Sequence, residues 1–325
     1  MNLFHRLGRW IDPSLEYHTM DLPFMESVIH NFKELYDKGL IYQDFRVQPY
    51  SWAAQTVLSN FEVNQPGCYR DKVDTAITVM FKLENGMHLL VWTTTPWTLF
   101  SNQMIAVGAD IDYAVMEENG QKYVLAVPLL GRYKKQLENA TQVATMKGSE
   151  LVGMSYEPMF PHFANLKEKG CFKILSGDFV STEDGTGMVH IAPGFGADDF
   201  DVCRKYDEHF PIVCPVDEAG CFTAEVPEVQ GKQVFDANEY VLNYLKENHL
   251  LVKKEQITHS YPHCWRTDTP LIYKAMSGWF VDVPKFRDEL CQLNQTITWT
   301  PEHIKDGRFG KWLEGAREWS ISRTR

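Results

Sequence analysis

The chain has 325 residues, of which 44% are hydrophobic and 13% aromatic, so it can build a sizeable core in one large domain with attached segments or in two domains. Its formal net charge is −11. This balance argues against a protein that binds a nucleic-acid backbone strongly on its own, because such proteins present an excess of Lys and Arg.

Helix signals mark residues 22–39. Pro23 suits the first turn of a helix, and Gly39 stands where a C-terminal cap belongs. The apolar residues between them recur at helical spacing: Phe24, Val28, Phe32 and Leu35. The pattern predicts an amphipathic helix over 22–39.

Two β-hairpins are predicted in the middle of the chain. The first covers 76–92 and turns at Asn85-Gly86, and the second covers 113–127 and turns at Asn119-Gly120. Asn-Gly between runs of apolar and β-branched residues is the strongest short-range hairpin signal.

One more strand and two more helices follow. A short strand over 188–192 ends at Pro193, and a helix is expected from about Asp198 to Tyr206. A better-marked helix runs over 236–248, where Asp236 with Glu239 resembles a capping box.

Strands and helices are intermixed without the strict alternation of a doubly wound sheet. We therefore expect a mixed α+β fold with a barrel-like β core and peripheral helices. The core is assigned to 76–254. The flanks, 1–75 and 255–325, are rich in Trp, Tyr and Pro and are interpreted as segments that belong to something larger.

Seven cysteines are scattered without a Cys-x-x-Cys pair, which argues against a zinc site and suits a reducing compartment. No apolar run is long enough for a transmembrane helix, and the first residues lack the apolar centre of a secretory signal. A cytoplasmic protein without a membrane partner is therefore expected.

The most informative stretch is 91–102, Val-Trp-Thr-Thr-Thr-Pro-Trp-Thr-Leu-Phe-Ser-Asn. Three consecutive hydroxyls stand at a strand end, and Pro96 cannot continue the ladder. Alternation along a strand puts Thr93 and Thr95 on one face and Thr94 on the other. Threonines also favour strands for structural reasons, so these few residues alone leave a purely structural interpretation open.

A second stretch, 183–200, reads Glu-Asp-Gly-Thr-Gly-Met-Val-His-Ile-Ala-Pro-Gly-Phe-Gly-Ala-Asp-Asp-Phe. It places His190 on a strand, then a glycine-rich loop, then Asp198 and Asp199 at a helix start. Taken alone, a histidine on a strand is more often structural than catalytic. Acidic residues in a first helical turn are likewise stabilised by the free N–H groups there.

Together these two stretches resemble the editing domain (connective peptide 1) of isoleucyl-tRNA synthetases, which are class I aminoacyl-tRNA synthetases. Thr95 and Trp97 favour the isoleucine branch, since the leucine and valine enzymes tend to have Arg and an acidic residue at these positions. The segment 260–280 resembles the return toward the catalytic domain of the same family, and residues 1–75 resemble the way in from it. No His-x-Gly-His string, the family's mark for ATP binding, occurs.

The resemblance implies post-transfer editing: hydrolysis of the ester of mischarged valyl-tRNA(Ile), with isoleucine excluded by size. A missing methylene changes binding by only about 1–3 kcal/mol, and this synthetase is the standard example of that problem. The expected partners are the 3′ acceptor end of tRNA(Ile), valine and valyl-adenosine-type ligands, bound by a monomer.

The resemblance also assigns roles to residues. Asp199, His190 and Thr94 are expected to carry catalysis, with Asp199 binding the α-ammonium group and His190 limiting the pocket and positioning water. Substrate binding is assigned to five further residues: Thr93, Thr95, Trp97, Asn102 and Asp198. Asp198 is also a candidate helix cap.

No cofactor or metal is expected, although the parent enzyme would use ATP and Mg²⁺ for aminoacylation. An ester is already activated, so positioning and electrostatics can suffice for its hydrolysis. A threonine nucleophile is the second choice because it needs an adjacent base. Two other functions stay open: a non-catalytic module that binds the tRNA acceptor end, and an editing domain of the valine or leucine branch.

Overall fold

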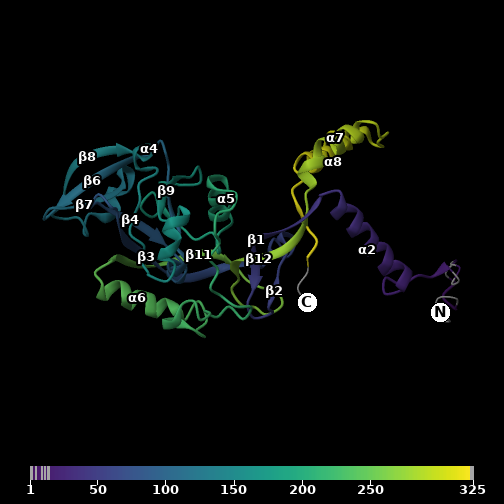
Figure 1. Ribbon diagram of the computed structural model, residues 1–325, viewed down its shortest axis with the longest axis horizontal. Coiled ribbons are helices and arrows are strands. Elements are labelled where there is room, and N and C mark those ends of the chain that lie inside the picture. Colours follow the sequence, from purple (N-terminus) through teal and green to yellow (C-terminus); the bar gives the residue numbers. More distant parts are fainter. Residues whose placement is uncertain (1–2, 4–5, 9, 11, 13–14, 323–325) are drawn as a thin grey trace. The chain divides into compact units, whose positions relative to one another are not determined.

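The computed structural model describes residues 3, 6–8, 10, 12 and 15–322, so the outermost parts of the predicted flanks lie outside the described residues. The chain divides into two compact units (Figure 1). The smaller comprises the described parts of Met1–Asp44 and Ser277–Arg323, and the larger comprises Phe45–Met276. The boundaries expected near residues 75 and 254 fall within two strands that pair with each other, β3 (Tyr69–Lys82) and β11 (Leu251–Pro262).

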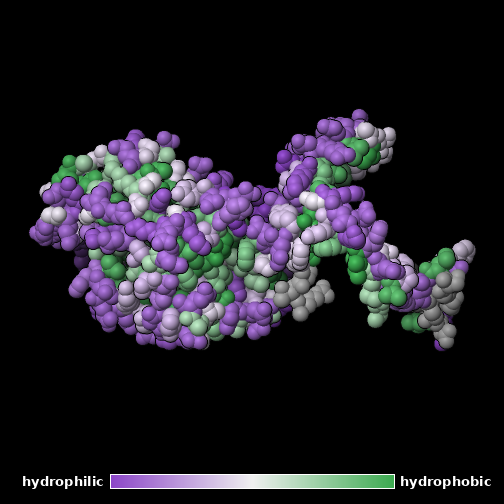
Figure 2. Space-filling view, viewed as in Figure 1, coloured by the Kyte–Doolittle hydropathy of each residue, from purple (hydrophilic) through white to green (hydrophobic). Residues whose placement is uncertain are grey.

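The smaller unit contains the predicted N-terminal helix. Its elements are α2 (Leu22–Asp37), η6 (Val283–Phe286), α7 (Arg287–Gln295), η7 (Glu302–Ile304), α8 (Arg308–Glu314) and β13 (Trp319–Ser320). The helix prediction is confirmed, and Gly39 ends α2 with a φ of 67°, where the Leu40 N–H donates to the Leu35 carbonyl. None of the residues of α2 is buried, and Figure 2 shows apolar surface along this helix.

The larger unit is built on a nine-stranded mixed sheet. Its strands are β3 (Tyr69–Lys82), β4 (His88–Thr93), β5 (Met104–Val107), β6 (Asp112–Glu118), β7 (Gln121–Ala126), β8 (Thr141–Lys147), β9 (Lys173–Ser176), β10 (Met188–Ile191) and β11 (Leu251–Pro262). They follow the order β8-β6-β7-β4-β10-β5-β9, with β3 joining β4 to β11. The sheet curls as half a barrel, which confirms the predicted mixed α+β fold (Figure 1).

The sheet divides at β4, and this division creates room for a pocket. One edge of β4 pairs with β3 along its whole length. On the other edge, β7 pairs with His88 and Leu89, whereas β10 pairs with Trp92. Both predicted hairpins are confirmed, with Asn119 and Gly120 at positive φ in the second turn.

The described chain contains further helices and strands. They are β1 (Ile41–Ser51), β2 (Thr56–Val57), α3 (Asn60–Val63), η2 (Pro96–Ser101), η3 (Val127–Tyr133), α4 (Gly148–Leu151), η4 (Ala164–Lys169), α5 (Ala197–Tyr206), η5 (Pro227–Val229), α6 (Ala237–Glu247) and β12 (Ile272–Val281). Helix α6 buries Ala237, Val241 and Leu245 in the main core of the larger unit.

The predicted capping box of α6 is wrong. Asp236 does precede the helix, but its side chain makes no capping hydrogen bond. Its backbone is already helical, with φ −73° and ψ −25°, whereas a capping side chain needs an extended residue. In the described part of the chain, no helix is both long and apolar enough to cross a membrane.

Candidate functional site

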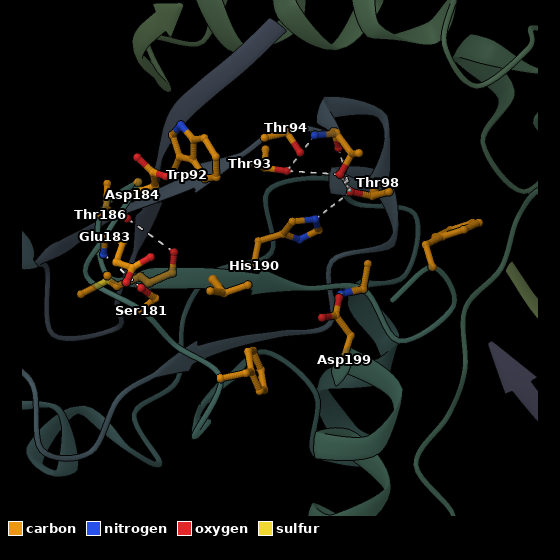
Figure 3. Close-up of a pocket in the computed structure, with 18 residues that line it drawn as sticks. Trp92, Thr93, Thr94, Thr98, Ser181, Glu183, Asp184, Thr186, His190 and Asp199 are labelled. Carbon is orange, nitrogen blue, oxygen red and sulfur yellow. Dashed lines mark hydrogen bonds between the residues drawn. The ribbon is translucent and has the colours of Figure 1, made fainter. Parts of the chain in front are cut away.

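A pocket of about 470 Å³ lies in the larger unit, where β4 and β10 end (Figure 3). Both stretches singled out in the sequence supply its lining. The lining residues are Trp92, Thr93, Thr94, Thr95, Thr98, Phe179, Ser181, Glu183, Asp184, Gly185, Thr186, Gly187, Met188, Val189, His190, Ala192, Phe195 and Asp199.

The threonines form one wall. Strand β4 ends at Thr93 and η2 begins at Pro96, as the proline predicts. The hydroxyls of Thr93 and Thr95 lie 3.4 Å apart on one side, and the Thr93 hydroxyl accepts the Thr95 N–H at 3.1 Å. Strand alternation predicted Thr94 on the opposite face. Because the chain leaves the strand after Thr93, all three threonines line the pocket.

His190, on β10, forms the centre of the pocket. Its side chain is buried, with Nε2 at 2.7 Å from the Thr98 hydroxyl and Nδ1 at 3.2 Å from the Asn102 amide nitrogen. Burial lowers the pKa of His190 to about 4, since no carboxylate offsets the lost hydration. The ring is therefore neutral at physiological pH, with both nitrogens engaged by the protein.

Asp199 supplies the carboxylate of the pocket from the first turn of α5. Its Oδ2 accepts the Ala192 N–H at 2.8 Å, and no described residue donates to Oδ1. Gly196 makes this position possible, because a Cβ there would lie 2.6 Å from the Asp199 Cγ. Burial raises the pKa of Asp199 to about 6, and the nearby charge of Asp198 adds to this against the opposing bond from Ala192.

Three of the predicted site residues lie outside the lining. Asp198 is exposed in the first turn of α5. It does not cap this helix, because Gly196 is the N-cap residue and no side chain makes a capping hydrogen bond there. Trp97 is buried, and its ring packs edge-on at 4.8 Å against Phe195, which does line the pocket. Asn102 is buried next to His190. Trp97 and Asn102 thus support the wall from behind.

A loop that the sequence did not single out for its side chains forms the opposite rim. Figure 3 shows Ser181, Glu183, Asp184 and Thr186 on one side of His190, with Thr98 and Asp199 on the other. Arg132, from η3, forms an ion pair with Asp184 and donates to the Glu183 carbonyl at 2.6 Å. The described residues contain no group of three or more acidic, His or Cys side chains placed to hold a metal ion.

Comparison with known proteins identifies the family. The family model for tRNA synthetases class I (I, L, M and V) matches residues 1–325. The chain belongs to this family. It is 50% identical to the isoleucine–tRNA ligases of Rickettsia canadensis (strain McKiel) and Rickettsia felis, over 98% of this chain. It spans 30% and 31% of the length of these two relatives.

Solved structures similar to this class I synthetase chain include editing domains. The P. knowlesi cytosolic leucyl-tRNA synthetase editing domain has a TM-score of 0.45 and 14% identity, covering 58% of this chain and 97% of that one. The P. falciparum cytosolic counterpart has a TM-score of 0.43 and 10% identity, covering 56% of this chain and 98% of that one.

Thr98 and Arg132 are site residues that sequence reasoning missed in this synthetase chain. Thr98 stands inside the threonine-rich stretch, so its hydroxyl was available as a signal. Arg132 lies about fifty positions before its partner Asp184, and no local pattern connects them. Only the folded arrangement of η3 and the loop reveals this contact.

Proposed function

We propose that this chain is the editing region of an isoleucyl-tRNA synthetase and hydrolyses the ester of valyl-tRNA(Ile). One observation carries the proposal: the half-buried Asp199 carboxylate, whose Oδ1 receives no hydrogen bond from any described residue, faces a pocket whose inner wall consists of hydroxyls and a neutral histidine. This arrangement suits a ligand with a cationic amino group beside a polar ester.

Asp199 binds the α-ammonium group of the aminoacyl ester. At pH 7 its carboxyl is ionised, because this pH lies above its pKa of about 6. A charge-assisted hydrogen bond in a partly desolvated pocket is strong and directional, so it fixes the adjacent carbonyl. Thr93, Thr94 and Thr95 then contact the ester and the terminal adenosine through hydroxyl and backbone groups.

His190 limits the size of the amino acid and does not act as a base. Its Nδ1 accepts from Asn102 and its Nε2 donates to Thr98, so neither nitrogen is available to take a proton from water. For the same reason it cannot activate a threonine nucleophile, and the direct attack of a positioned water remains the favoured route.

The proposed partner is the 3′ acceptor end of tRNA(Ile), presented within a longer cytoplasmic enzyme whose ATP- and Mg²⁺-dependent aminoacylation lies outside this chain. The net charge of −11 fits a domain that receives the tRNA end from elsewhere in that enzyme. We propose hydrolysis without a cofactor or metal, by a monomer.

The test is hydrolysis by the purified chain of valyl-tRNA(Ile) and isoleucyl-tRNA(Ile), with Asp199→Ala as the matched inactive variant. We expect the chain to release valine from valyl-tRNA(Ile) much faster than it releases isoleucine from isoleucyl-tRNA(Ile). We also expect it to release valine much faster than the Asp199→Ala variant does. Binding of the tRNA end without hydrolysis would favour the non-catalytic module. Preferential release of another amino acid from tRNA(Val) or tRNA(Leu) would assign the chain to another branch.

A further inference from the structure

A continuous row of hydrogen bonds runs behind the pocket wall and connects Asn102, His190 and Thr98. The Asn102 amide nitrogen donates to the Met104 carbonyl at 2.9 Å and lies 3.2 Å from His190 Nδ1. His190 Nε2 lies 2.7 Å from the Thr98 hydroxyl, which donates to the Thr95 carbonyl at 2.8 Å.

The two ends of this row fix its direction. Backbone carbonyls only accept hydrogen bonds, so Asn102 presents its NH₂ group to Met104. Thr98 directs its proton to Thr95, whose carbonyl oxygen lies at 2.8 Å and whose hydroxyl oxygen lies at 3.1 Å. The second N–H of Asn102 then points at His190 Nδ1, which must accept. His190 Nε2 must consequently carry the proton and donate to Thr98. The opposite tautomer would place two donors face to face between Asn102 and His190.

Tyr156 holds the remaining atom of Asn102. Its hydroxyl donates to the Asn102 Oδ1 at 2.7 Å. The Tyr156 side chain is fully buried, and its ring packs edge-on against two phenylalanines. The ring centroids lie 5.4 Å apart for Phe81 and 5.9 Å apart for Phe172. Burial raises the pKa of Tyr156 well above 10, so the hydroxyl remains a donor. Asn102 is thus held at both its oxygen and its nitrogen.

We propose that Tyr156 is a positioning residue for substrate selection: by holding Asn102, it fixes the tautomer and the ring orientation of His190 in the pocket wall. This inference rests on the proposed function, because it assigns His190 the role of size filter. With both nitrogens engaged, the ring presents its carbon atoms to the ligand at a fixed place. Tyr156 lies outside the pocket lining and acts only through Asn102.

Loss of the Tyr156 hydroxyl leaves the Asn102 Oδ1 buried without a donor, which is unfavourable in a core. The amide can then turn its oxygen toward His190 Nδ1, and the ring can populate the tautomer protonated at Nδ1. The pocket wall then has more than one arrangement of its hydrogen bonds. Phenylalanine at position 156 keeps the aromatic ring and its packing contacts, so we expect the Tyr156→Phe variant to fold.

The experiment compares Tyr156→Phe with Tyr133→Phe. Tyr133 is an equally buried tyrosine whose hydroxyl also bonds a side chain, the Thr78 hydroxyl at 2.8 Å, in a separate core cluster. Protein labelled with ¹⁵N-histidine gives the protonation of each ring nitrogen, and the signals of His190 are identified by their loss in His190→Ala. Hydrolysis of valyl- and isoleucyl-tRNA(Ile) is measured on the same preparations.

In the parent and in Tyr133→Phe, His190 is expected neutral with its proton on Nε2. In Tyr156→Phe, a second population protonated at Nδ1 is expected, and the ratio of valyl to isoleucyl hydrolysis falls about tenfold. A parent protein protonated at Nδ1 would overturn the proposal, as would a folded Tyr156→Phe with unchanged nitrogen signals and an unchanged ratio. The nitrogen signals need no activity, so a failure of the proposed function is recognised separately, by a parent that hydrolyses neither ester.

Discussion

The inner wall and the rim of the pocket differ in how their polar groups are held. On the inner wall, Thr93, Thr98 and His190 are buried, and their polar atoms are hydrogen-bonded to neighbouring groups of the protein. On the rim, the Asp184 side chain is 73% exposed and its partner Arg132 is 50% exposed. One side of the site is fixed by a buried hydrogen-bond network, and the other is held by a solvent-exposed ion pair.

This difference indicates that the inner wall determines selectivity and that the rim contributes to binding. A buried network has one arrangement, so it can discriminate shapes that differ by a methylene. An exposed ion pair contributes little free energy to folding or binding, so its side chains can rearrange around different ligands. Substitutions on the inner wall should therefore change chemistry and selectivity strongly, and those on the rim should change binding weakly.

The largest effect is expected for Asp199→Asn, which keeps the shape of the wall and removes its charge. Hydrolysis of valyl-tRNA(Ile) should fall about 100-fold or more, because the ammonium loses its charged partner. The stability effect should have the opposite sign. The pKa of Asp199 is raised from 3.8 to about 6, so folding stability is lost as pH rises through this window.

At pH 7.5 the Asn variant should consequently be more stable than the parent, by about 3 kcal/mol at most, because that is the free energy of a shift of about two pKa units. Urea denaturation at pH 7.5 and pH 4 measures this, and the difference should shrink at the lower pH. Parent-like hydrolysis by the variant would refute Asp199 as the anchor.

The next effect is expected for His190→Ala. A smaller side chain removes the steric strain that excludes isoleucine, so hydrolysis of isoleucyl-tRNA(Ile) should rise about tenfold while some valyl activity remains. His259→Ala, which alters a histidine of β11 outside the pocket lining, is the control. A variant that loses valyl activity without gaining isoleucyl activity would show that His190 is catalytic or structural, and would move the filter to Thr93, Thr95 or Trp97.

The pH profile separates the two inner-wall residues. Below about pH 6, kcat/KM for valyl-tRNA(Ile) should fall about tenfold per unit, because Asp199 becomes protonated. Above about pH 8 it should fall again as the substrate α-amino group loses its proton. His190, with a pKa of about 4, should add no inflection between these limits. A limb near pH 6 that persists in Asp199→Asn would contradict this assignment.

The smallest effect is expected at the rim. Arg132→Gln removes the exposed ion pair with Asp184, so KM should rise about two- to threefold with kcat unchanged. Lys82→Gln, which breaks a comparably exposed pair with Glu157 outside the pocket, should leave both parameters unchanged. A large loss of kcat in Arg132→Gln would mean that the rim shares the rigidity of the inner wall.

Local patterns in the sequence were sufficient for the elements and for much of the site. Asn85-Gly86 and Asn119-Gly120 specify their hairpins because the turn geometry depends on adjacent residues only. Gly39 ends α2 for the same reason. Five of the eight predicted site residues line the pocket: Thr93, Thr94, Thr95, His190 and Asp199. Their place in the sequence was sufficient to find them, since β4 and β10 end at this pocket and α5 begins there.

Tertiary structure decided which side chains face the ligand and which support it. Trp97 and Asn102 stand in the same motif as the threonines, yet packing against Phe195 and His190 puts them behind the wall. Tyr156 and Arg132 reach the site across long stretches of chain, through contacts 54 and 52 positions apart. Periodicity and turn signals describe neighbours within a few residues, whereas burial and hydrogen-bond direction arise only when distant strands meet in one core.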